Sequence, residues 1–158
     1  MAYRLTALIG DRRVLAEVAA ELPVAQVVEL GAGMSLLPLT KPVLDQVPTG
    51  PPGDPPLRRF DSLVPGLARL AARCSRVGPL LYAEAQTYGG PGSQAVIAWR
   101  DGQVSFGPVL TQDAVEGRET EGFVTVSRLH DRAINRGLRH LGVGIAPTTS
   151  TGTPTSST

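Results

Sequence analysis

The sequence has little of the chemistry on which most metal proteins and disulfide-rich proteins depend. Among its 158 residues are one cysteine, two histidines and seven aromatic residues, namely one Trp, three Tyr and three Phe. Cys74 alone cannot form an internal disulfide, and a structural zinc site usually takes about four Cys or His ligands. We therefore expect no disulfide framework, no metal site and no cofactor.

An excess of charge of one sign and long apolar runs are also missing. Fifteen basic and fourteen acidic side chains give a formal net charge of +1, whereas proteins that bind nucleic acid are usually much more basic. No apolar run approaches the roughly 20 residues that span a bilayer, and residues 1–10 lack the apolar segment of a secretory signal. These absences argue against nucleic-acid and membrane partners and predict a cytoplasmic protein.

Arginine and turn-forming residues, by contrast, are plentiful. Arginine supplies every basic residue except Lys41, and Gly and Pro together make up 32 of the 158 residues. This bias is typical of a GC-rich bacterial or phage genome. The functional alternative, recognition of anions by the guanidinium group, lacks an accompanying acid-binding or phosphate-binding motif.

The spacing of apolar residues predicts an α+β domain. Helical periodicity, with a capping residue or a terminating glycine or proline, predicts helices over 11–22, 63–76 and 128–141. Extended segments bounded by turn residues predict strands over 3–9, 25–30, 34–39, 80–88, 93–99 and 103–106. We expect an antiparallel sheet that includes a three-stranded meander over 80–106, with the helices packed on one face.

Residues 1–145 are expected to form a single domain, because the length suits one hydrophobic core. Within it, residues 48–56 contain five prolines and two glycines and predict a stiff exposed loop. Residues 146–158 are composed almost entirely of Thr, Ser, Pro and Gly. Such a tail buries too little apolar surface to offset its ordering entropy, so we expect it to be disordered.

The segment 89–94, Gly-Gly-Pro-Gly-Ser-Gln, is the most distinctive motif. Its glycines would let the backbone approach a ligand or partner closely, or would simply permit a wide hairpin turn or bulge. It lacks the Gly-Lys-Ser/Thr ending of a phosphate-binding loop and precedes a strand rather than a helix. We interpret it as a structural turn whose best functional role is contact with a partner.

The strand before this loop has a polar and aromatic face. Alternation places Tyr82, Glu84, Gln86 and Tyr88 on the same side. This side is either an open face of the sheet or a recognition surface, because Tyr and Trp are enriched in binding hot spots. The predicted partner-binding residues are Glu84, Gln86, Tyr88, Gly89, Gly90, Gly92, Gln94 and Trp99.

Candidate catalytic groups are few and dispersed, so we predict no catalytic residues. His130 and His140 are ten positions apart on the last predicted helix, roughly 15 Å along its axis, and do not share a site by themselves. Two arginines near Cys74 favour its thiolate, but a histidine partner would have to come from that distant helix. The alternative function is a small enzyme or small-molecule binder that uses the 89–94 loop with Glu84 or Cys74.

Four arginines, Arg128, Arg132, Arg136 and Arg139, form a basic stripe along the last predicted helix. Nucleic-acid contact is one interpretation. A solvated helix face that pairs with the acidic segment 116–121 is the other, and the net charge near zero favours it. A structural or nucleic-acid-binding accessory protein is the third alternative. An acidic partner protein would also fit this basic stripe.

Three segments carry a resemblance to known proteins. They are 34–40 (Met-Ser-Leu-Leu-Pro-Leu-Thr), the hairpin over 82–99 with its Gly-Gly-Pro-Gly-Ser-Gln-Ala-Val-Ile-Ala-Trp run, and 134–143 (Ile-Asn-Arg-Gly-Leu-Arg-His-Leu-Gly-Val). With them the chain resembles small, uncharacterised bacterial accessory proteins of immunity-protein type. The resemblance implies no catalytic residues and favours a binding role.

The sequence therefore predicts a non-enzymatic protein-binding module of immunity or inhibitor type. It would act through an exposed sheet face and the glycine-rich loop, and its partner would be a protein such as a toxin.

Overall fold

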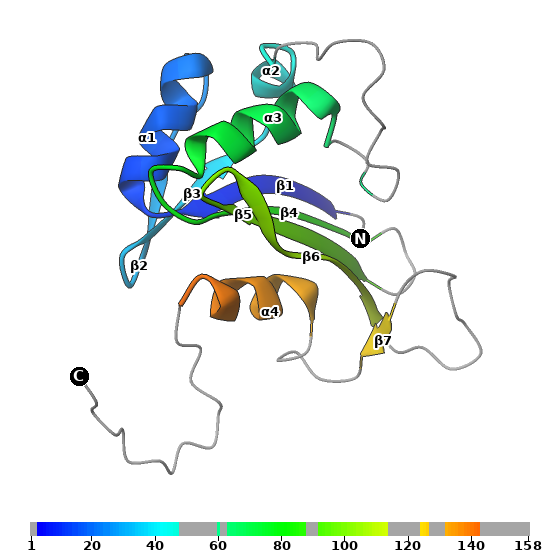
Figure 1. Cartoon of the computed structure of the whole chain (residues 1–158). Helices are drawn as coiled ribbons and strands as arrows, with labels where there is room; N and C mark the ends of the chain where they lie inside the picture. The colour runs from blue at the N-terminus through cyan, green and yellow to red at the C-terminus, as the bar shows by residue number, and fades with distance from the viewer. Residues whose placement is uncertain are drawn as a thin grey trace.

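A computed structural model of the chain describes residues 3–47, 60, 63–87, 92–113, 124–126 and 132–142. The strands in these residues are β1 (Tyr3–Gly10), β2 (Val28–Gly31), β3 (Met34–Pro38), β4 (Leu80–Thr87), β5 (Ser93–Arg100), β6 (Gln103–Asp113) and β7 (Val124–Val126). The helices are α1 (Arg12–Glu21), α2 (Lys41–Leu44), α3 (Pro65–Cys74) and α4 (Ala133–His140) (Figure 1). No helix among the described residues is long and apolar enough to cross a membrane. The predicted loop 48–56 and tail 146–158 lie outside this part of the chain.

The strands form one sheet in the order β2-β3-β1-β4-β5-β6-β7. Neighbouring strands are antiparallel except at one edge, where β7 pairs parallel to β6. The predicted α+β class is confirmed, and β4, β5 and β6 form the predicted meander. Within this meander, the turn at 101–102 returns β6 directly onto β5.

The last strand of the meander is longer than predicted. The sequence places its end at Phe106, because Gly107 and Pro108 are poor strand residues. In the structure Gly107 has φ +87°, the register shifts here, and the strand continues so that Ser93 pairs with Gln112. The glycine therefore bends the strand at a bulge and does not end it.

Helices pack on both faces of the sheet, and the prediction that they pack on one face is wrong. Figure 1 shows α1, α2 and α3 on one side of the sheet and α4 on the other. Leu8 and Tyr82 belong to the hydrophobic cluster of α1 and α3, whereas Ile9 and Leu81 belong to the cluster that contains Ala133 of α4. The central strands carry nearly continuous apolar runs, Leu-Leu-Tyr-Ala in β4 and Ala-Val-Ile-Ala-Trp in β5. Such runs are buried on both faces, so each face needs a helix.

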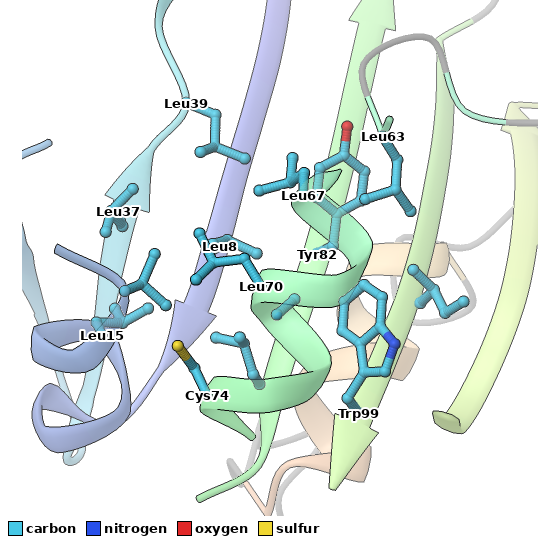
Figure 2. Packing of buried hydrophobic residues seen from close by; sticks show 14 of the residues in the cluster. Leu8, Leu15, Leu37, Leu39, Leu63, Leu67, Leu70, Cys74, Tyr82 and Trp99 are labelled. Atoms are coloured by element: carbon cyan, nitrogen blue, oxygen red, sulfur yellow. The ribbon is translucent and has the colours of Figure 1, made fainter. Parts of the chain in front are cut away.

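The larger core lies between the sheet and α1 and α3. Figure 2 shows Leu8, Leu67 and Tyr82 converging there, with the Trp99 indole on the neighbouring strand. The ring of Phe60 meets the ring of Tyr82 edge to face, with the centroids 5.5 Å apart. The apolar stripe of α3 is thus matched by large side chains that alternate along β1, β4 and β5.

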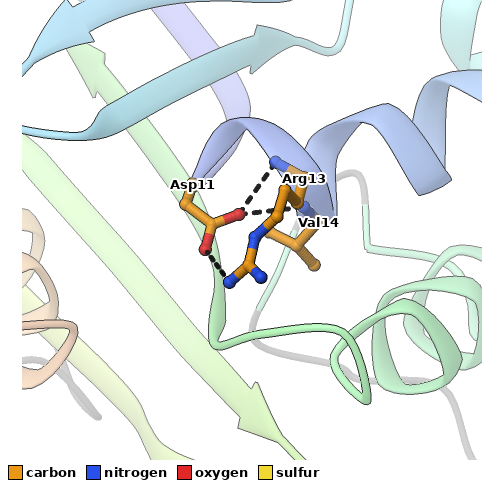
Figure 3. Close-up of polar contacts among 3 residues, drawn as sticks. All are labelled: Asp11, Arg13 and Val14. Atoms are coloured by element: carbon orange, nitrogen blue, oxygen red, sulfur yellow. Dashed lines mark hydrogen bonds and ion pairs between the residues drawn. The ribbon is translucent and has the colours of Figure 1, made fainter.

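Helix α1 begins where the sequence predicts, because Asp11 caps it. The carboxylate of Asp11 accepts hydrogen bonds from the backbone N–H groups of Arg13 and Val14 at 2.9 and 3.0 Å (Figure 3). These are two of the donors that a helix N-terminus leaves without an intrahelical partner. Partial burial opposes ionisation, but the hydrogen bonds from Val14 and Arg13 and the Arg13 charge outweigh it and lower the pKa of Asp11.

Candidate functional site

The face predicted to be a recognition surface is the face that carries the larger core. Trp99 is only 3% exposed and Tyr82 is fully buried, both beneath the helices of that face. The expectation that Trp99 contacts a partner is therefore corrected, because a side chain packed in this core cannot reach one. Tyr88, Gly89 and Gly90 lie outside the described residues.

Two residues of the glycine-rich motif have structural roles inside the domain. The side-chain oxygen of Gln94 accepts a hydrogen bond from the backbone N–H of Ile134, 3.0 Å away at the start of α4. The carbonyl of Gly92 accepts from the N–H of Asp113 at 2.8 Å and so joins β6 to the start of β5. These two residues of the motif therefore make contacts within the domain, whereas positions 89–91 lie outside the described residues.

The N-terminus of α4 is capped by strands and not by its own flanking residue. Its N-cap residue, Arg132, makes no side-chain capping bond. Instead, Thr111 Oγ1 on β6 accepts from the N–H of Ala133 at 2.9 Å, beside the bond made by Gln94. Arg132 pairs with Asp113 on β6 at 2.9 Å. Arg132 of the predicted basic stripe therefore anchors α4 to the sheet through Asp113, whereas Arg128 and the acidic segment 116–121 lie outside the described residues.

Glu84 and Gln86 lie on the face of the larger core, toward the C-terminal end of β4, and are half-buried. Glu84 is opposite Thr6 on β1, and Gln86 is opposite Arg4. The Tyr82 hydroxyl donates a hydrogen bond to the Glu84 carboxylate. The polar groups predicted on β4 thus continue onto β1, where the sequence predicts no site.

A cavity of about 370 Å³ opens beside this polar end of the sheet. Its described lining residues are Arg4, Thr6, Leu39, Lys41 and Leu44. The N–H of Leu39 donates to the carbonyl of Thr6 at 2.8 Å, which holds the chain that leads into α2 against β1. The sequence signal for this site was the pair Arg4 and Thr6, polar residues at strand spacing on the same side as the core residue Leu8.

The candidate catalytic groups are kept apart by the sheet. Cys74 is buried on α3, and burial raises the pKa of its thiol although the charge of Arg73 opposes this. His140 is on α4, across the sheet, where its ring stacks on Phe106 and its Nε2 lies 3.0 Å from the Ser105 hydroxyl. Burial, together with the charge of Arg100, lowers the pKa of His140. His130 lies outside the described residues, and within them no three His, Cys, Asp or Glu side chains cluster to hold a metal ion.

On the α4 side, part of the sheet is not covered by any helix of the described residues. Paired residues Val28, Leu36, Ile9 and Leu81 form one apolar row across β2, β3, β1 and β4. Exposure falls along this row from 46% at Val28 to 4% at Ile9 and zero at Leu81. The reason is that α4 packs on β4, β5 and β6 and does not extend over the β2 edge.

We call the exposed part of this side the outer sheet face and define it by residues that strand pairing places there. They are Leu5, Val28, Met34, Leu36 and Pro38. Leu5 and Val28 are exposed, and the other three are half-buried. No sequence signal distinguished this face from a covered one, because its residues are as apolar as those beneath α4.

No protein-family model, curated protein or solved structure matches the chain. Two regions of the described residues offer chemistry that bears on function. One is the outer sheet face, and the other is the cavity beside Arg4 and Thr6.

Proposed function

We propose that the protein is a non-enzymatic binding module that recognises another protein through the outer sheet face. The observation that carries the proposal is the apolar row whose exposure increases from Leu81, beneath α4, to Val28 at the sheet edge. Large contiguous apolar patches are uncommon on monomeric proteins and mark contact sites, whereas single exposed apolar side chains are normal. Covering this face would extend the smaller core by the same kind of packing that α4 already provides.

The arrangement of the remaining chemistry supports binding over catalysis. The Cys74 thiol is buried and held in its neutral form, and Glu84 is hydrogen-bonded to a core tyrosine. His140 lies on the opposite side of the sheet from both. A nucleophile needs a base within hydrogen-bonding reach, and the described residues do not supply that pairing for Cys74 or Glu84.

An immunity or inhibitor role is the form of this function that the resemblance favours. In that role the partner is a toxin or another enzyme, and occupation of the outer sheet face would block it by contact alone. The partner surface would be apolar, to match the exposed aliphatic side chains of Leu5 and Val28.

The test compares two valine-to-aspartate variants. Val28→Asp places a charge on the outer sheet face, whereas Val104→Asp places the same charge on β6, at a valine of similar exposure outside that face. Tagged wild-type protein and both variants are used for affinity capture in the native host, and each captured protein is then purified and titrated against all three by calorimetry. We expect one partner whose affinity falls by roughly tenfold or more with Val28→Asp and little with Val104→Asp.

Three results would contradict the proposal. One is a partner that binds wild type and folded Val28→Asp equally. Another is the absence of any captured protein that Val28→Asp loses. The third is self-association of the purified wild type that Val28→Asp abolishes, since the face would then be an interface between copies of this chain.

A further inference from the structure

The helices are distributed unequally over the two faces of the sheet. On the face of the larger core, α1 packs on β1 and β3, α3 packs on β4 and β5, and the two helices contact each other. On the opposite face, α4 packs mainly on β4, β5 and β6 (Figure 1). Strands β4 and β5 therefore lie between two helices, whereas β3 has α1 on one side and the outer sheet face on the other.

Helix α4 turns an apolar flank toward this uncovered part of the sheet. Its start and its end both contact β6, so the helix runs along that strand. At its end, the His140 ring stacks on Phe106 and marks the flank that faces β6. Leu138 is two positions earlier, about 200° around the helix, and so lies on the flank toward β1 and β3. Ile134, one turn before Leu138 on the same flank, is half-buried like it.

We infer that the outer sheet face receives an amphipathic α-helix of the partner protein, which lies beside α4 over β1, β3 and β2. This inference rests on the proposed protein-binding function and names the element that the partner contributes. Neighbouring strands are about 4.8 Å apart, so the distance from β1 across β3 to β2 is roughly 10 Å, the diameter of one helix with its side chains. The packing of α1 on β1 and β3 shows that these strands already accommodate one helix on their other side.

The side chains of this surface suit the apolar stripe of such a helix. Leu36 and Met34 on β3 form the floor, Val28 and Leu5 lie on the neighbouring strands, and none of them is charged. Leu138 of α4 adds an apolar side wall. A helix with apolar residues at positions i, i+3, i+4 and i+7 would bury them against this surface and leave its polar side in water.

Addition of a strand at the β2 edge is the other way in which a sheet binds a peptide. Strand β2 has only four residues, and its register with β3 shifts between Glu29 and Gly31. Glu29 also places a charge on this edge strand, where it pairs with Arg12 of α1 at 3.6 Å. Short strands, bulges and charged side chains are the features that oppose pairing at a sheet edge. The structure therefore favours a helix on the face over a strand at the edge.

The test uses a phage-displayed library of random peptides of about sixteen residues, long enough for roughly four helical turns. The library is selected on the immobilised full chain, and peptides that also bind Val28→Asp are removed. We expect the remaining peptides to have apolar residues at helical spacing and to become helical on binding, as measured by circular dichroism. A proline at the centre of each peptide should weaken binding by roughly tenfold or more.

Two variants of α4 test whether the bound peptide lies beside this helix. Leu138→Ala shortens the side wall and should weaken peptide binding by roughly three- to tenfold in calorimetric titrations. Arg136→Ala, on the β6 flank one turn before His140, is the matched control and should leave the affinity within about twofold. In the wild-type chain, the peptide should also shift the NMR amide signals of Leu36, Ile134 and Leu138, a measurement that does not depend on how any variant folds.

Strictly alternating apolar residues in the selected peptides, with no loss of binding on insertion of proline, would overturn the inference. So would equal affinity for wild type and folded Leu138→Ala, amide shifts confined to other parts of the chain, or the recovery of no peptide that Val28→Asp loses. In each of these cases, a natural partner whose binding is weakened by Val28→Asp would leave the proposed protein-binding function standing.

Discussion

At the scale of single residues, a few positions matter because of backbone geometry and not because of their side chains. Gly107 is the clearest case. It adopts φ +87°, and a Cβ atom at this position would lie 2.7 Å from the carbonyl oxygen of Val96. Both facts follow from the bulge that lets β6 continue past its bend. The strand therefore depends on this glycine, although the sequence pattern predicts that the strand ends just before it.

Substitution of Gly107 gives a stability prediction with an internal control. Gly107→Ala should lower the free energy of unfolding by about 2–4 kcal/mol, because it combines a left-handed backbone conformation with a clash against backbone. Gly142 has φ +96° but no atom within 4 Å of the same hypothetical Cβ. Gly142→Ala should therefore cost only about 1–2 kcal/mol. Urea unfolding of both variants measures the difference, and equal losses would contradict the clash.

Asp11 supplies a second residue-scale prediction, which concerns pH. Its pKa is lowered in the folded protein, so its capping contribution is complete above the ordinary value of 3.8 and is lost as the pH falls through the lower folded value. Asp11→Ala should cost about 1 kcal/mol at neutral pH, and this difference from wild type should shrink below about pH 4. Urea unfolding at pH 7 and pH 3 measures it. Asp11→Asn, which caps without a charge, should not follow the same profile.

At the scale of elements, the prediction agrees with the structure where local sequence signals such as caps and turns are strong. Helix α1 has a capping aspartate and apolar helical spacing, and it begins within one residue of the prediction. The Asp-Gly turn at 101–102 places β5 and β6 as expected. By contrast, α3 begins at Pro65, after the predicted start at 63, because a proline at the first helical position sets the boundary. The start of α4 has no local sequence signal, because its capping groups come from another part of the chain.

The docking of α4 gives an element-scale prediction. Gln94→Ala removes the acceptor for the Ile134 N–H, and loss of one such bond should destabilise the helix by about 0.5–1.5 kcal/mol. Hydrogen exchange of the α4 amides should accelerate, while exchange in β1 and β4 stays as in wild type. Gln103→Ala, at the exposed start of β6, is the control. Unchanged exchange in α4 would show that the other contacts of the helix suffice to hold it.

At the scale of the whole molecule, the distribution of helices decides which surfaces remain open. Three helices cover one face of the sheet, whereas α4 covers only the centre of the other. The outer sheet face is therefore left open at the β2 edge, and the cavity forms where α2 meets the end of β1. The outer sheet face and this cavity lie on opposite faces of the sheet.

The candidate site shows why the burial of strand residues is hard to predict from the sequence. Alternation correctly placed Tyr82, Glu84 and Gln86 on one side of β4. It could not tell that α3 covers the first of them and leaves the other two half-buried. The same limitation hid the role of Gln94, whose partner is forty residues away in sequence.

The sequence by itself determined the α+β class, the meander, the start of α1 and the scarcity of reactive groups, because these depend on composition, short-range periodicity, caps and turns. The tertiary structure alone decided that α4 packs opposite the other helices, that Trp99 is buried and that Val28 and Leu5 are exposed. The physical reason is that an apolar strand residue has the same local pattern whether a helix covers it or not. Its burial depends on where distant segments of the chain pack.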